Sequence, residues 1–180
     1  LNQETNLVYT VKGAMLIPIL YKDYGIRTLG DLDFLIKHEH CKVVEKKLFE
    51  YGYCYGTYDT NNKCIVPMDR MELIKWKTGA TNMCPFLKIN NNQSEIVPFF
   101  KLDFRHSMDI NLDDSPINEI IEEAKTYGQI RPHHVLVHLA CHLFHEATSD
   151  IAVFYYKDIN LIKFCDIREY IIHYMNQNYL

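Results

Sequence analysis

The fold of this chain is decided by a ten-residue stretch from Arg27 to Ile36, RTLGDLDFLI. Its last six residues alternate polar and apolar side chains and then become fully apolar, which is the pattern of a strand entering a core from an exposed end. Because side chains alternate along a strand, Asp31 and Asp33 should point to the same face. The stretch therefore predicts a core strand that carries a pair of carboxylates at one end.

A pair of carboxylates on one face is stable only when a cation relieves the repulsion between them. Oxygen ligands on a rigid strand suit Mg²⁺, which usually keeps waters and substrate phosphates as its remaining ligands. A third acid, Asp103, lies in the segment KLDFR, on a predicted strand that could lie beside the first. Three such aspartates can bind two metal ions about 4 Å apart, an arrangement that steadies the oxygens of a phosphoryl transfer. The candidate metal ligands are therefore Asp31, Asp33 and Asp103.

A second candidate feature lies upstream, where residues 6–11 read as a strand that runs into a turn at Gly13. A helix is expected from residue 14 to about residue 21, although it contains Pro18. Backbone N–H groups at such a turn, with the positive end of a helix dipole, can hold a phosphate, and a glycine allows close approach. Lys12 and Arg27 could add positive charge against a triphosphate.

The rest of the chain predicts a mixed sheet followed by helices. The elements expected up to residue 107 are a helix at 39–51, short β-like pieces near 71–76 and 85–89 in an irregular stretch, a turn at 90–94, and a strand at 96–107 whose start Pro98 places at a sheet edge. Helices are expected at 115–127, with Ser115 as the cap, at 132–147, and within 151–175. We therefore predict an α+β fold, with an α/β core at residues 1–112 and a helical part at 113–180 packed on it.

Composition narrows the possible functions. The chain has 180 residues, of which 48% are hydrophobic and 23% are charged, as in an ordinary globular protein. Its formal net charge of −4 argues against duplex nucleic acid as a partner, because such binding relies on clustered Lys and Arg. Six cysteines form no C-x-x-C pair, and no apolar run is long enough to span a membrane. We expect a cytoplasmic protein with reduced thiols, and, since the chain begins without Met, a piece of a longer protein.

The motifs resemble those of a known family. The run VKGAML from Val11 to Leu16, Tyr21, and the stretch from Arg27 to Ile36 are similar to a K-G-x-x-L turn, an Arg and a D-[IL]-D strand. This pattern is typical of a bacterial family of uncharacterised nucleotidyltransferases, a branch of the DNA polymerase beta superfamily. Leu102-Asp103-Phe104 resembles its third carboxylate strand. The helix from Pro132 to His145, followed by Lys157-Asp158-Ile159, resembles its helical tail.

The resemblance implies a polymerase-beta-like mixed sheet and a magnesium-dependent transfer of a nucleotide from a nucleoside triphosphate, such as ATP, to an acceptor. Asp31, Asp33 and Asp103 would bind two Mg²⁺ ions, or Mn²⁺, and Asp103 would accept the proton of the acceptor hydroxyl. The acceptor oxygen would attack the α-phosphorus, and pyrophosphate would leave. The residues implied in nucleotide binding are Lys12, Gly13, Ala14, Arg27 and Gly30.

The acceptor implied by the resemblance is a small molecule or a peptide, since similar proteins occur beside biosynthetic and peptide-modification systems. Candidate contacts to it are Arg105, His138, His142 and Lys157. Two residues depart from the pattern. Ala14 stands where the wider superfamily has Ser after the glycine, and Arg105 stands where the branch commonly has His.

Four histidines recur at helical spacing on one face, at positions 134, 138, 142 and 145, and Glu146 lies one turn after the third. They either bind zinc, since two His one turn apart are a known ligand pair, or form a polar face toward the cleft or solvent. Two alternatives to the transferase therefore remain. One is a catalytically silent nucleotide-binding module of the same fold, and the other is a zinc-dependent hydrolase built on this helix.

Overall fold

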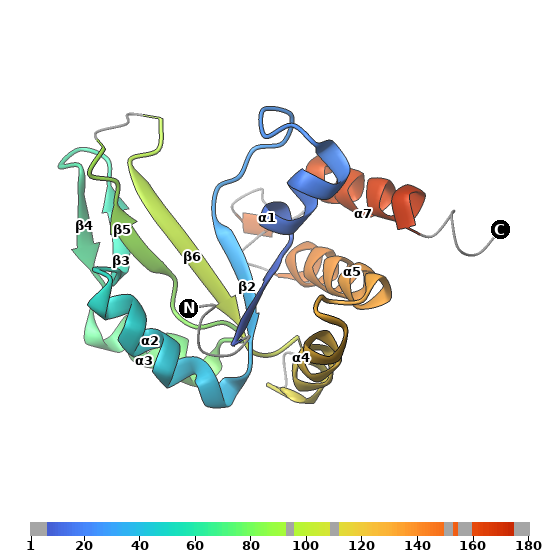
Figure 1. Ribbon diagram of the computed structural model, residues 1–180. Coiled ribbons are helices and arrows are strands. Elements are labelled where there is room, and N and C mark those ends of the chain that lie inside the picture. Colours follow the sequence, from blue (N-terminus) through green and yellow to red (C-terminus); the bar gives the residue numbers. More distant parts are fainter. Residues whose placement is uncertain (1–6, 93–95, 109–111, 150–152, 155–159, 175–180) are drawn as a thin grey trace.

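The computed structural model describes residues 7–92, 96–108, 112–149, 153–154 and 160–174. It contains a six-stranded mixed sheet in the order β1-β2-β6-β5-β3-β4 (Figure 1). The strands are β1 (Val8–Val11), β2 (Leu32–Ile36), β3 (Cys54–Asp59), β4 (Cys64–Pro67), β5 (Phe86–Ile89) and β6 (Phe99–Arg105). The β2–β6 pair is parallel and the other four pairs are antiparallel. The chain therefore has the mixed α+β class that the sequence predicts.

Helices cover both faces of the sheet (Figure 1). The α-helices of the described residues are α1 (Gly13–Leu16), α2 (Cys41–Glu50), α3 (Arg70–Gly79), α4 (Ser115–Tyr127), α5 (Pro132–Thr148) and α7 (Leu161–Tyr174), with a π-helix η1 (Ile17–Tyr21) and a 3-10 helix η2 (His38–His40). One face of the sheet packs on α2, with Val44 and Leu48 against Ile36. The other packs on α4, with Ile117 and Ile121 against the adjacent Leu35.

A third hydrophobic cluster lies beyond the sheet and joins the first helix to the last two. Leu16 of α1 is fully buried against Val135 and Leu139 of α5 and Tyr170 of α7. The helices at the end of the chain are thereby attached to the turn that follows β1. The division into a core at 1–112 and a helical part at 113–180 stays a prediction. None of the helices within the described ranges combines the length and apolar character that a membrane span requires.

The register of β2 and β6 is held by aromatic packing. Phe34 lies opposite Phe104, and their rings stack with centroids 5.0 Å apart. Phe104 also meets Phe86 edge to face at 5.8 Å, inside the same cluster. A slip by one residue would turn Phe104 to the other face of the sheet and Asp103 into this apolar cluster, at a large cost in desolvation.

Several sequence predictions need correction. The β-like piece expected at 71–76 is wrong, because these residues lie in α3, whose N-cap Asp69 accepts a hydrogen bond from the backbone N–H of Glu72 at 2.8 Å. Strands β3 and β4 were not expected in the irregular stretch. The expected cap Ser115 is instead the first residue of α4, after Asp114. The turn expected at 90–94 and the last expected helix lie partly outside the described residues.

Pro18 and Pro98 show how proline shapes this sheet and its first helix. The helix expected at 14–21 changes after Leu16 into a π-helix that has Pro18 in its first turn. Pro98 precedes β6, which lies inside the sheet and not at its edge. Residues 99–101 pair with β5 alone, however, so the first part of the strand has a neighbouring strand on one side only.

Replacing Phe104 with Ala should lower the free energy of unfolding by about 3–5 kcal/mol, because a fully buried ring is lost from the centre of the core. Urea denaturation followed by circular dichroism would measure this change. Phe100→Ala in the same strand is the matched control, since that ring is 41% exposed and should cost much less. Equal losses in the two variants would contradict the proposed role of the Phe34–Phe104 stack in holding the register.

Candidate active site

A cavity of about 670 Å³ lies over the face of β2 and β6 that carries the three aspartates. The turn after β1, the loop that precedes β2, and helices α5 and α7 form its walls, and Trp76 of α3 reaches its rim. Of the residues predicted for the site, it is lined by Lys12, Gly13, Arg27, Gly30, Asp31, Asp33, Asp103, Arg105 and His142. Ala14 and His138 do not line it, and Lys157 lies outside the described residues.

The three aspartates lie on the same side of the sheet. Asp33 and Asp103 are direct partners in the parallel β2–β6 register. Asp31 immediately precedes β2, two residues before Asp33, and all three line the cavity. Parallel pairing at this register places the carboxylates of neighbouring strands side by side, which is the relation that the sequence predicted.

Two lysines neutralise these carboxylates. The Nζ of Lys12 lies 2.6 Å from Oδ1 of Asp33. The Nζ of Lys101 bridges the other two, 3.0 Å from Oδ2 of Asp31 and 2.8 Å from Oδ2 of Asp103. One oxygen taken from each of the three carboxylates does not give a set of atoms that all lie within 4.8 Å of one another. The ammonium groups therefore take up the charge that a divalent ion would otherwise neutralise.

The surroundings of Asp31 and Asp103 shift their pKa values in opposite directions. Burial raises the pKa of Asp103, and the nearby charges of Asp31 and Asp33 add to burial, so that the attraction of Lys101 does not restore the usual value. Burial also acts on Asp31, but the charge and hydrogen bond of Lys101 outweigh it and lower its pKa. Asp103 is thus the better proton acceptor of the two, a property typical of a general base.

The turn at the end of β1 has unusual backbone geometry. Lys12 has φ 52° and ψ −132°, a conformation that costs a non-glycine residue about 1–3 kcal/mol. The chain then enters α1 at Gly13, where an added Cβ would lie 2.3 Å from Nη1 of Arg27. A side chain at this position would force the arginine away. Gly13 is therefore required by close packing as well as by any ligand that approaches the turn.

Arg27 is held by an acid that the sequence did not reveal. Its Nε and Nη2 donate to the two carboxylate oxygens of Asp166 on α7, at 2.9 and 2.6 Å. The hydroxyl of Tyr21 donates to the same carboxylate at 2.7 Å, and Asp166 is only 2% exposed. Arg27 lines the cavity, but this bidentate pair gives it a second role, because it ties the loop before β2 to the last helix.

The histidines of α5 do not converge on one point. His138 is buried, and neither ring nitrogen has a hydrogen-bond partner in the described part of the chain; burial, followed by the charges of Lys12 and Arg105, lowers its pKa to about 3. His142 lines the cavity with its Nε2 3.5 Å from Oε1 of Glu146, and burial lowers its pKa as well. Both rings are therefore neutral at pH 7.

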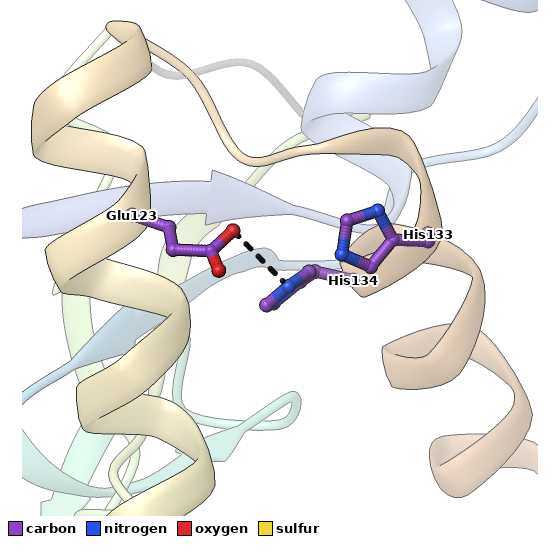
Figure 2. A group of neighbouring side chains, drawn as sticks. All are labelled: Glu123, His133 and His134. Carbon is purple, nitrogen blue, oxygen red and sulfur yellow. Dashed lines mark ion pairs between the residues drawn. The ribbon is translucent and has the colours of Figure 1, made fainter.

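His134 points toward α4, with its Nε2 3.4 Å from a carboxylate oxygen of Glu123. Figure 2 shows it with His133 and Glu123, and in the part of the chain that the structure describes these three form the one group whose potential ligand atoms all lie within 4.8 Å. Arg131 places a guanidinium nitrogen 3.4 Å from the Glu123 carboxylate, and the group lies at the start of α5, where the helix dipole is positive. Both features disfavour a cation. Within the described residues, positions 134, 138, 142 and 145 do not bring their ring nitrogens together, so the zinc alternative gains no support from this helix face.

Several cavity residues were not predicted. Lys101 could have been found, because a residue two positions before Asp103 in a strand shares its face. Trp76 lies on α3, which was not expected to be a helix. Glu146 and Lys163 form an ion pair that joins α5 to α7 across the cavity wall. No local pattern reports such a pair, because it depends on the packing of two helices.

All of residues 1–180 match the model of a protein family described as "Uncharacterised nucleotidyltransferase". The chain belongs to this family. The match confirms the family resemblance predicted from the sequence and identifies the chain, at this coarse level, as a nucleotidyltransferase. No curated protein and no solved structure matches the chain.

Replacing Lys101 with Met should make the protein more responsive to Mg²⁺. The substitution leaves Asp31 and Asp103 without the ammonium that bridges them, so added Mg²⁺ has no lysine to displace and relieves a repulsion. We expect a larger rise in melting temperature with Mg²⁺ than in the original protein. Lys125→Met, at a surface ion pair, is the control. A smaller response of Lys101→Met to Mg²⁺ would contradict the idea that Lys101 stands at a cation site.

Proposed function

We propose that this protein transfers a nucleotidyl group from a nucleoside triphosphate to a hydroxyl or similar group on a small molecule or peptide, with Mg²⁺ and release of pyrophosphate. The observation that carries the proposal is the parallel register of β2 and β6, which pairs Asp33 with Asp103 in a cavity that also contains Asp31. The finer assignment of the sheet to the polymerase beta type, with a core at 1–112 and a helical part at 113–180, belongs to the same proposal.

The residues present fit a magnesium site. Carboxylate oxygens are the ligands that Mg²⁺ prefers, and the three aspartates offer them on one wall of a cavity large enough for a triphosphate. Asp31, Asp33 and Asp103 would hold the ions. When bound, the ions would supply charge neutralisation for the attacking and leaving oxygens. Lys12 and Lys101 would then be free to contact phosphate oxygens.

The geometry of the turn after β1 supports the proposal that this turn binds the triphosphate. The first N–H groups of a helix have no partner within the helix, and here those of Gly13 and Ala14 follow the strained Lys12. Gly30 lines the cavity, and an added Cβ there would meet nothing within 4 Å. Lys12 is already close to Asp33, so a small movement of its ammonium group takes it from the carboxylate to a phosphate. Arg27 contributes charge and holds the loop.

The reaction can be written for these residues. The acceptor oxygen forms a bond to the α-phosphorus, and the bond from that phosphorus to the oxygen bridging toward the β-phosphate breaks. Pyrophosphate leaves with the electron pair of the broken bond. The hydroxyl proton passes to Asp103, whose raised pKa suits the role of proton acceptor. Catalysis would depend mainly on positioning and on charge neutralisation.

The acceptor would lie toward α5. Arg105 and His142 line that side of the cavity, and His138 lies buried behind them. Lys157, proposed for the same side, lies outside the described residues. The alternative, a silent module of the same fold, would bind nucleotide without turnover. Pyrophosphate release in the presence of candidate acceptors separates the two.

Asp33→Asn should abolish transfer while the protein stays folded. The single tryptophan, Trp76, lines the cavity and provides a fluorescence signal for binding of a non-hydrolysable nucleotide with Mg²⁺. We expect the variant to lose at least tenfold in Mg²⁺-dependent affinity, equal to about 1.4 kcal/mol. Calorimetry would confirm the affinities, and circular dichroism would confirm folding.

The matched control is Asp59→Asn, at an exposed carboxylate outside the cavity, which should bind as the original protein does. Full pyrophosphate release by Asp33→Asn would contradict the role proposed for this aspartate. Binding by the original protein that does not depend on Mg²⁺ would count equally against the proposed metal site.

A further inference from the structure

The charges that line the cavity are almost all paired. Within the described residues the cations are Lys12, Arg27, Lys101, Arg105 and Lys163, and the acids are Asp31, Asp33, Asp103, Glu146 and Asp166. Four of the cations form ion pairs with these five acids. Arg105 differs, because its side chain makes no hydrogen bond or ion pair with any described residue. Among the described residues, Arg105 is thus the one cavity cation without a direct partner.

Arg105 is also deeply buried, with 8% of its surface exposed. Its backbone is fixed, because it ends β6 in register with Leu35 and forms a bridge to Asn82. Burying an ion costs several kcal/mol unless partners compensate, and the charges of Asp33 and Asp103 act only from a distance. A buried guanidinium that faces a cavity without a partner points to a ligand that completes it.

Two histidines of α5 also have buried polar atoms without a hydrogen-bond partner among the described residues. Both ring nitrogens of His138 and the Nδ1 of His142 are buried without a hydrogen-bond partner in the part of the chain that the structure describes, and the charges of Lys12 and then Arg105 act on both rings. A neutral ring has one N–H donor and one acceptor nitrogen. A positive guanidinium excludes a cation and suits an oxyanion, and its planar shape matches a carboxylate or a phosphate in a bidentate manner.

The position of Arg105 separates this oxyanion from the triphosphate. Arg105 follows Asp103 by two residues on the same face of β6, about 7 Å farther along the strand. The turn at Gly13 lies two strands away, with Lys12 available there for the triphosphate. Lys101 lies on β6 itself, four residues before Arg105. A group bound to Arg105 would therefore lie beside the residue proposed to accept the proton of the acceptor.

We infer that Arg105 forms an oxyanion-binding subsite for the acceptor, so that the acceptor is a small molecule with a carboxylate or a phosphate in addition to the hydroxyl that receives the nucleotide. The identity of the occupant as acceptor rests on the proposed function, whereas the subsite itself does not.

The subsite is tested with three matched probes, glycerol phosphate, glycerate and glycerol, which differ in their anionic group. Calorimetry is run with and without a saturating non-hydrolysable nucleotide and Mg²⁺, which fill the triphosphate end of the cavity. We expect the original protein to bind at least one of the two anions, and to bind it more tightly than glycerol by at least tenfold. The anion that binds more tightly shows whether the group is a phosphate or a carboxylate.

Arg105→Met keeps the length of the side chain and removes its charge, so it should weaken anion binding at least tenfold and leave binding of the nucleotide and Mg²⁺ unchanged. Arg105→Lys keeps the charge without the planar geometry and should show an intermediate loss. Arg168→Met, at an arginine that is 69% exposed in its side chain and lies outside the cavity, is the matched control and should change neither affinity. Circular dichroism checks that each variant is folded.

Anion binding that is equal in the original protein and in Arg105→Met would overturn the subsite, as would a preference for glycerol over both anions or no anion binding by the original protein. These results differ from a failure of the proposed function, in which nucleotide and Mg²⁺ do not bind at all. Arg105-dependent anion binding in that case would still establish the subsite. If Arg105→Met does not fold, Arg105→Lys decides between these outcomes.

Discussion

The site depends on one pairing, the parallel register of β2 and β6. Side chains alternate along a strand, so the same alignment that stacks Phe34 on Phe104 inside the core sets Asp33 beside Asp103 on the opposite face. The aromatic rings supply the stability, and the carboxylates occupy the positions between them. A sheet that pairs its core correctly therefore assembles its acidic site without any further adjustment of the backbone.

Charge balance is the second constraint. Three carboxylates on one wall would repel one another, and the structure relieves this with lysines that approach from β6 and from the turn after β1. Lysine suits this place because its ammonium is a compact charge on a flexible stem, which in the proposed reaction would move from a carboxylate to a phosphate. Arg105 differs from these lysines because it is deeply buried.

Local patterns predicted the strands that carry the site. The alternation of polar and apolar residues indicates which face of its strand each of Asp31, Asp33 and Asp103 occupies, without knowledge of the rest of the fold. The helices 115–127 and 132–147 were confirmed to within a residue or two. The helix α3 was missed because its apolar residues show only a weak helical pattern. Its start is marked instead by the N-cap Asp69, which accepts a hydrogen bond from the backbone N–H of Glu72. The partner of Arg27 could not be predicted, because it depends on packing between segments far apart in the chain.

The ion pair between Arg27 and Asp166 joins residues 139 positions apart. A ribosome makes the loop before β2 long before it makes α7, so a nascent chain can pair its strands while this arginine still lacks its acid. The wall that α7 gives to the cavity is then added last, as the C-terminal helix docks. An unfinished chain therefore lacks one wall of the cavity until synthesis has passed Asp166.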